Sequence, residues 1–377
     1  MKSLFFIGII FSQMVIEVRE PFIKKIGVFI TGPQAITKRM EKMLGYFGEV
    51  ETGKEDYLIK ITNSDEKWVF HLFGPGVNLT KNFAGKNPSV LAKEFSNIFV
   101  KEVLSRNPPF ASNIAFVEGP PGKREVYISS PDGMDKRRVS TGCKLAMSPS
   151  WTHDGRKILF VCYMVKRPDI FIIDLLEGIQ KPLFITENFK ATPVISPDGR
   201  FIVYSTSDGE AIDLFLYELK TGKVKRLTSD EFIEVSPSFS PDGRKIAYTS
   251  DKEGKPGIYI MDLDSGKRER ITSPFEYATS PEFSPDGEKL IYTKVQNNPR
   301  VYIYYINEGR EEMVKMDSFY GCENPSFAPS GDLIAVSCKD ESFCWRIYIV
   351  DLLYGKTSLL TFSNFDQKTP SWSSSLW

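Results

Sequence analysis

A proline recurs along this chain at an almost constant interval. The recurring prolines are Pro149, Pro193, Pro237, Pro281, Pro325 and Pro370. They lie 44, 44, 44, 44 and 45 residues apart, and each follows Ser, Thr or Asn. The surrounding sequence repeats too, since Ser-Pro-Ser-Phe-Ser-Pro-Asp-Gly-Arg-Lys at 236–245 becomes Ser-Pro-Glu-Phe-Ser-Pro-Asp-Gly-Glu-Lys at 280–289. A period in the forties with strand and turn signals in every unit is typical of β-propeller blades.

One repeat contains the signals of four strands. We expect a short inner strand at 238–240, directly after the proline, and further strands at 244–250, 258–263 and 267–272. Tight turns with Pro or Asp before Gly separate these segments, as in Pro241-Asp-Gly243 and Asp264-Ser-Gly266. Four antiparallel strands with short loops make one propeller blade.

The two ends of the repeat region complement each other. The sixth proline begins only an inner strand, Ser371-Trp372, whereas the strands expected at 113–118, 124–130 and 136–141 have no proline-led inner strand of their own. We therefore expect the C-terminal strand to complete the first blade. The alternative, an open solenoid, would leave exposed sheet edges. The repeats predict a six-bladed all-β propeller over residues 110–377, closed by the C-terminal strand.

A different pattern precedes the repeats. Strands are expected at 25–31, 57–62 and 68–73, and helices at 36–47 and 89–104, the second with Ser89 as its N-cap. Asn107-Pro-Pro109 then interrupts the chain. The pattern predicts a small N-terminal α/β domain over residues 25–106, so the fold class is two-domain.

The first residues have the character of an export signal. A basic start, Met1-Lys2-Ser3, precedes the apolar run Leu4 to Phe11. This predicts a signal peptide over 1–12, cut after Ser12, and an N-terminal arm over 13–24. A buried first strand of a cytoplasmic protein is the alternative. No other segment approaches ~18 consecutive apolar residues, so we expect a soluble mature protein.

Composition argues against several kinds of chemistry. Lys plus Arg and Asp plus Glu number 48 each, which gives no basic field for nucleic acid. The chain has two histidines and no Gly-x-Ser-x-Gly elbow, so a propeller peptidase of the prolyl oligopeptidase kind is not indicated. We predict no enzyme activity, no cofactor and no metal site.

The five cysteines do not suggest a disulfide framework in a chain of this length. Cys162 and Cys338 lie in apolar strands, where small core residues are expected. Cys338 and Cys344 flank one short loop and could form a disulfide in an oxidising compartment.

Large apolar residues recur in the loops between each outer strand and the next inner strand. Circular repetition would place them at one height around the channel rim, among acidic residues, as a cup for a peptide or protein domain. The alternative is that each ring packs beneath its own loop. The candidate partner-binding residues are Phe189, Thr192, Phe232, Glu234, Val235, Glu276, Tyr277, Tyr320 and Phe365.

The whole pattern resembles the TolB family, periplasmic propeller proteins of the Tol-Pal envelope system. The resemblance covers the chain from about residue 17 to its end. The matching segments are Glu17-Val18-Arg19, Lys25-Ile-Gly-Val-Phe29, the Ser-Pro-Asp-Gly-Arg-Lys repeats, Ser112-Asn-Ile-Ala-Phe-Val117 and Thr369-Pro-Ser-Trp372.

The resemblance implies a non-enzymatic, monomeric scaffold in the periplasm, held near the outer membrane by its partner. It would bind a Pal-like peptidoglycan-associated lipoprotein through the propeller face and a TolA-like protein through the N-terminal arm, with Glu17, Val18 and Arg19 as arm residues. Its role would be to support outer-membrane integrity and constriction at cell division. The alternatives are an accessory module that binds a peptide or carbohydrate, and a remnant of a propeller-type peptidase.

Overall fold

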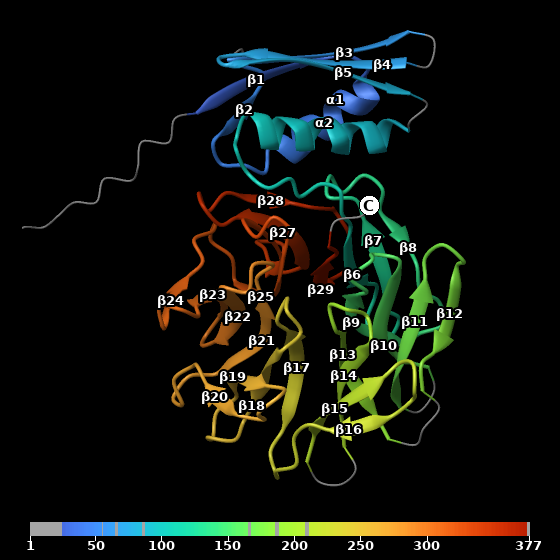
Figure 1. Cartoon of the computed structure of the whole chain (residues 1–377), viewed down its shortest axis with the longest axis vertical. Helices are drawn as coiled ribbons and strands as arrows, with labels where there is room; N and C mark the ends of the chain where they lie inside the picture. Colours follow the sequence, from blue (N-terminus) through green and yellow to red (C-terminus); the bar gives the residue numbers. More distant parts are fainter. Residues whose placement is uncertain are drawn as a thin grey trace, which may run out of the picture.

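A computed structural model describes residues 25–374 apart from 55, 65–66, 85–86, 165–166, 185–187 and 208–210. A small α/β domain sits against one side of a six-bladed β-propeller (Figure 1). This confirms the predicted fold class. The expected signal segment and the arm with Glu17, Val18 and Arg19 lie outside the described residues.

The α/β domain is a five-stranded sheet with two helices on one face (Figure 1). The strand order is β2-β1-β3-β4-β5, with β1 parallel to β2 and β3 and the other pairs antiparallel. The elements are β1 (Ile26–Thr31), α1 (Gln34–Leu44), β2 (Val50–Thr52), β3 (Tyr57–Ser64), β4 (Lys67–Gly74), β5 (Val77–Ala84) and α2 (Pro88–Glu102).

Several predicted boundaries in this domain were wrong. The sequence did not indicate β2 or β5, because β2 has three residues and β5 is an edge strand in which Asn and Lys dilute the apolar alternation. Helix α1 ends at Leu44, where Gly45 forms the cap. The N-cap of α2 is Asn87, whose side chain accepts a hydrogen bond from Ser89 N at 2.8 Å, so Ser89 lies inside the first turn.

Each blade is an antiparallel four-stranded sheet whose strands follow one another from the channel outward. From inner to outer strand, blade 1 is β29 (Gln367–Trp372), β6 (Ile114–Glu118), β7 (Glu125–Ser129) and β8 (Arg137–Arg138); blade 2 is β9 (Leu145–Trp151), β10 (Lys157–Tyr163), β11 (Pro168–Asp174) and β12 (Ile179–Pro182); blade 3 is β13 (Lys190–Ile195), β14 (Phe201–Thr206), β15 (Asp213–Glu218) and β16 (Val224–Arg226). Blade 4 is β17 (Glu234–Phe239), β18 (Lys245–Ser250), β19 (Gly257–Asp262) and β20 (Arg268–Arg270); blade 5 is β21 (Ala278–Phe283), β22 (Lys289–Val295), β23 (Pro299–Tyr305) and β24 (Arg310–Met313); blade 6 is β25 (Gly321–Phe327), β26 (Leu333–Lys339), β27 (Trp345–Asp351) and β28 (Thr357–Leu359).

The C-terminal strand closes the ring, as the repeat pattern predicted. Strand β29 pairs antiparallel with β6, so that Trp372 lies opposite Ile114. The Trp372 ring is buried, and its Nε1 donates to Ser112 Oγ at 2.7 Å. Strands from opposite ends of the chain therefore share one blade, which leaves the ring without an open edge.

The repeat prolines lie inside the inner strands rather than before them, which corrects the predicted strand starts. In blade 4 the pairing shifts between Val235 and Ser238, on either side of Pro237. The residue before each proline has a φ between 46° and 57°, in the left-handed region. Proline has no N–H for the ladder, so a β-bulge at this point lets the inner strand continue.

The cysteine predictions were also wrong. Cys143 is bonded to Cys162, and Cys322 to Cys338, while Cys344 is free. Cys322 and Cys338 lie directly opposite each other on β25 and β26. Which cysteines pair depends on the register of β25 against β26, which shifts at the bulge, and the spacing of cysteines in the sequence does not determine that register.

The two domains share a continuous apolar core. Phe47 packs edge-on against Phe110, and Tyr46 donates its hydroxyl to Pro131 O at 2.6 Å. Arg106 pairs with Asp332 at 2.7 Å and with Asp351 at 3.0 Å. Pro131 and Asp332 lie in turns between third and fourth and between first and second strands, and Asp351 ends the third strand β27, so the opposite face of the ring points away from the α/β domain. None of the described helices is long and apolar enough to span a membrane.

Candidate functional site

The face of the propeller away from the α/β domain is called the distal face here. It is formed by the described residues of the loops from each outer strand to the next inner strand, at 139–144, 183–184, 188–189, 227–233, 271–277, 314–320 and 360–366, and of the loops between second and third strands. The antiparallel order of each blade puts both kinds of loop at the same end of the sheet.

The structure separates the candidate residues into three groups. Tyr277, Tyr320 and Phe365 are exposed on the distal face. Phe189, Phe232, Val235 and Glu276 are half-buried and Glu234 is buried. Thr192 lies in the channel wall, where its Oγ1 accepts a hydrogen bond from Ser236 N at 3.2 Å.

The exposed aromatic residues gather on blades 5, 6 and 1 rather than evenly around the rim. Phe275 is 83% exposed, Phe362 69% and Phe343 60%. With the three exposed candidates they form what we call the aromatic patch, which consists of Phe275, Tyr277, Tyr320, Phe343, Phe362 and Phe365. Large apolar side chains exposed on neighbouring loops of one face are typical of surfaces that bind another molecule.

Phe343 and Phe362 were not predicted, because all the predicted residues lie within five residues before a repeat proline and these two do not. Phe343 lies between β26 and β27, with φ at 58°, and stacks on Tyr320 with ring centroids 4.6 Å apart. The Arg346 guanidinium lies over the Phe362 ring, with its Cζ 4.9 Å from the ring centroid. A single Phe in the otherwise polar segment Asp340-Glu-Ser-Phe343 was the available signal.

Hydrogen bonds hold the loops of the patch in place. Arg270 donates to Thr272 O and Ser273 O at 3.0 and 3.1 Å, and Lys255 donates to Phe275 O at 3.0 Å. Arg346 pairs with Asp340 in the loop that carries Phe343. A loop whose backbone is already held in place has less backbone entropy to lose when a partner binds.

Charges around the patch are paired within the molecule. Glu276 binds the Lys294 ammonium at 2.6 Å, and Glu323 binds Lys368 at 2.9 Å. Lys368 also lies over the Trp345 ring, 4.1 Å from its centroid. The rim is therefore mixed in sign, and the patch offers a partner mainly apolar contact.

The central channel contains a cavity of about 320 Å³, lined by the inner strands around their bulges. Glu282 in this wall takes the position held by Ser238 and Ser326 in neighbouring repeats. Its Oε1 accepts hydrogen bonds from Phe327 N at 2.7 Å and Ser326 Oγ at 3.2 Å, which ties blade 5 to blade 6. Burial raises the pKa of Glu282 to about 7.

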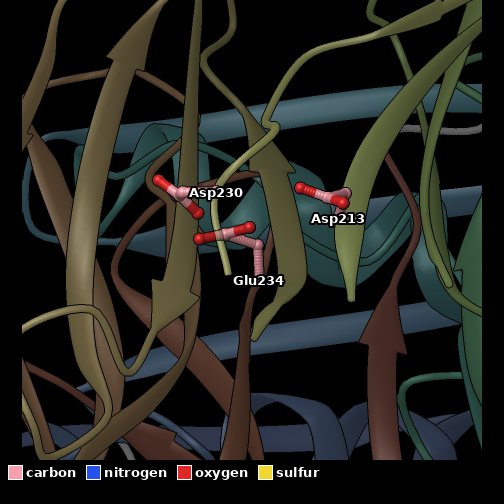
Figure 2. A group of neighbouring side chains, drawn as sticks. All are labelled: Asp213, Asp230 and Glu234. Atoms are coloured by element: carbon pink, nitrogen blue, oxygen red, sulfur yellow. The ribbon is translucent and has the colours of Figure 1, made fainter. Parts of the chain in front are cut away.

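One acidic group has the spacing of metal ligands. Asp213, Asp230 and Glu234 bring carboxylate oxygens within 4.8 Å of one another (Figure 2). Arg226 pairs with Asp213, while Arg268 and Lys252 lie 3.0 and 3.4 Å from Asp230. Among the described residues, these three cations offset the charge of the three carboxylates, and we assign the group no metal ion.

Of the three carboxylates, Glu234 is the one that the described cations do not pair with. Its side chain is 1% exposed, and Oε1 accepts a hydrogen bond from Ser250 Oγ at 3.0 Å. Burial, reinforced by the neighbouring Asp230, raises the pKa of Glu234 to about 7.

Comparison with known proteins gives consistent relatives. The model of the TolB beta propeller domain matches residues 101–376. The Tol-Pal system protein TolB of Desulfosudis oleivorans is 30% identical over 127 residues, which cover 33% of this chain and 29% of that protein. The protein TolB homolog of Chlorobium luteolum is 27% identical over 111 residues, 29% of this chain and 26% of that protein. The chain thus matches less than a third of the length of these relatives.

A solved structure matches over much more of the chain. TolB from Acinetobacter baumannii superposes with a TM-score of 0.81 over 93% of this chain and 97% of that one, at 21% identity. This likeness includes the α/β domain as well as the ring and shows a shared fold. Because the family model spans most of the sequence, the chain belongs to the TolB β-propeller family.

Proposed function

We propose that this protein is a non-enzymatic periplasmic scaffold of the Tol-Pal system that binds a Pal-like lipoprotein through the aromatic patch. The observation that carries the proposal is the cluster of six exposed aromatic side chains on the face away from the α/β domain. Family membership and the names of the relatives support the choice of system.

The patch can supply enough binding energy for a specific complex. Burying one exposed Phe contributes roughly 1.5–3 kcal/mol, and interface hot spots commonly exceed about 2 kcal/mol on truncation. Loops already held by Arg270, Lys255 and Arg346 keep the ordering cost low.

The second proposed partner is a TolA-like protein that binds residues 13–24, with Glu17, Val18 and Arg19 as contacts. This rests on the sequence resemblance, since the arm lies outside the described residues. We place the mature protein in the periplasm, cut after Ser12, as a monomer held at the outer membrane by its lipoprotein partner. Its roles are outer-membrane integrity and constriction at division.

A carbohydrate-binding module is less well supported. Trp151 and Trp372, the inner-strand tryptophans, are buried within the ring. Their Nε1 atoms already donate to Ser371 O and Ser112 Oγ. Both line the channel cavity but are only 7% and 6% exposed, so neither presents an open ring face to a sugar.

The test is a binding titration with the globular domain of a Pal-like lipoprotein from the same organism. The double variant Phe343→Ala with Phe362→Ala should bind at least about a hundredfold more weakly, with an unchanged melting temperature. The matched control, Leu176→Ala with Leu353→Ala, removes exposed leucines from turns on the opposite face and should bind normally. Equal affinity of both double variants would refute the patch as the binding site.

A further inference from the structure

Two buried carboxylate oxygens near the distal face lie beside each other without a donor. Glu234 Oε2 and Asp230 Oδ1 have no hydrogen-bond partner within the described part of the chain. Figure 2 shows the two carboxylates turned toward each other, with Asp213 on the neighbouring strand β15. Two ionised carboxylates in this arrangement would repel strongly, and a shared proton removes the conflict.

The preceding repeat has a different pair of residues in this place, and the remaining repeats have Ala146, Ala278, Cys322 and Gln367 at the position of Glu234. Asp169 and Lys190 lie one 44-residue repeat before Asp213 and Glu234. There the Lys190 ammonium and Asp169 carboxylate are 3.7 Å apart, and Lys190 is buried as Glu234 is. In the later repeat a carboxyl group stands where the preceding repeat has an ammonium, so this position provides no cation.

The surrounding cations do not reach the two inner oxygens. Arg226 from β16 pairs with Asp213, and Arg268 from β20 and Lys252 from the β18–β19 loop contact Asp230 through its outer oxygen, Oδ2. Among the described residues, the other titratable groups near the pair are Asp213 and Tyr248 from β18, while Asp251 accepts a hydrogen bond from Ile233 N at 2.8 Å in the same loop.

We propose that Glu234 and Asp230 share one proton, which latches the loop 227–233 in place, and that loss of this proton above neutral pH releases the loop. The loop carries Phe232 and the exposed Ile233 on the distal face. The link from the latch to lipoprotein binding rests on the proposed function, whereas the latch itself does not.

The step involves one proton. In the closed form Glu234 Oε2–H donates to Asp230 Oδ1, and on opening the proton passes to solvent. Glu234 stays fixed, because its N–H donates to Ile212 O at 2.7 Å and its Oε1 accepts from Ser250. Asp230 is the mobile partner, since Arg268 and Lys252 can hold it in an outward position.

The pH range follows from the environment of Glu234. Its pKa is about 7 in the folded protein, above the ordinary value of 4.5. The folded state therefore binds more protons between these values, and the latch weakens as pH rises through 7. This is the direction expected for a buried acid.

The test reads the loop without any partner, by hydrogen–deuterium exchange between pH 5.5 and 8.5, corrected for intrinsic exchange. Protection of the Ile233 amide, which donates to Asp251 in the closed loop, should fall at least about tenfold across this range in the unmodified protein. Glu234→Gln and Asp230→Asn each supply an amide donor that does not titrate, so protection should stay constant. Glu276→Gln, in the next loop, is the matched control and should behave like the unmodified protein, because Lys294 neutralises Glu276.

Constant protection in the unmodified protein, or an equal loss in both amide variants, would overturn the latch. Protection that depends on added CaCl₂ and disappears with EDTA would also overturn it, because a metal would then hold the pair. Titration of the lipoprotein domain at pH 6 and 8 separates the two proposals. A working latch without lipoprotein binding refutes the proposed function, and binding with pH-independent exchange refutes the latch.

Discussion

The two faces of the propeller ring use similar residues in opposite ways. On the side of the α/β domain, Tyr46, Phe47 and Phe110 are buried, and Arg106 reaches Glu49, Asp332 and Asp351. On the distal face, Phe275, Phe343 and Phe362 remain exposed. The first face is an interface already made within the chain, and the second has the composition of an interface without its partner.

Mutation should reveal this difference as a difference in stability. Changes within the ring or on the α/β side should unfold the protein more readily, and equally large changes on the distal face should not.

Replacing Trp372, the aromatic residue of the closing strand β29, should lower the stability of the protein most. Trp372→Ala deletes a buried ring that joins β29 to the shared core, so we expect a loss of about 3–5 kcal/mol in the free energy of unfolding, measured with urea. Trp345 is half-buried on the distal side, so Trp345→Ala is the comparison and should lower the free energy of unfolding much less. A loss of similar size in the two variants would show that Trp372 does not hold the ring closed.

The second-largest loss of stability should follow from breaking the ion pairs between the two domains. Arg106→Ala leaves buried Glu49 and Asp351 without their cation, so we expect a loss of about 3 kcal/mol. Arg310→Ala also removes an arginine paired with two glutamates, but on the surface, and should change stability by less than about 0.5 kcal/mol. Equal effects would contradict the view that the α/β side is a closed interface.

The channel wall should give a smaller, pH-dependent effect. Because the pKa of Glu282 is about 7 when folded and 4.5 ordinarily, ionising Glu282 weakens the folded state as pH rises from about 4.5 to 7. Glu282→Gln keeps the acceptor for Phe327 N and should recover about 1–2 kcal/mol of this loss at neutral pH. Glu288 is exposed, so Glu288→Gln should leave the pH profile of the melting temperature unchanged. If Glu282→Gln also had the same pH profile as the unmodified protein, ionisation of Glu282 would not be what weakens the fold.

The distal patch should hardly affect stability. Phe275→Ala and Phe362→Ala remove side chains that are mostly exposed, so each should lose less than about 0.5 kcal/mol in thermal or urea unfolding. A loss above 2 kcal/mol would place these rings in the core and remove the main argument for a binding surface.

The sequence predicted the ring better than its details. Regular prolines and Asp-Gly turns gave six blades and their closure, because these features depend on local turn chemistry. The pairing of Cys322 with Cys338 was missed because it depends on cross-strand register at a bulge. Strand β5 was missed because a polar edge strand has little periodicity.

The site was predictable only in part. Alignment on the prolines located Tyr277, Tyr320 and Phe365, which are exposed, but could not separate them from the half-buried Phe189 and Phe232. Exposure depends on how each loop packs against the next blade. Phe343 belongs to a loop that varies among the repeats, and Glu234 gains its properties from Asp230 and Asp213, which only the fold brings together.

The decisive measurement is a hydrogen–deuterium exchange footprint of the whole protein with and without the Pal-like lipoprotein domain. We predict new protection in 271–277, 314–320, 340–345 and 360–366, the segments that carry the aromatic patch. The turns at 174–178 and 351–356, on the other face, should exchange as before. Protection confined to those turns or to the α/β domain, with the patch unchanged, would contradict the account.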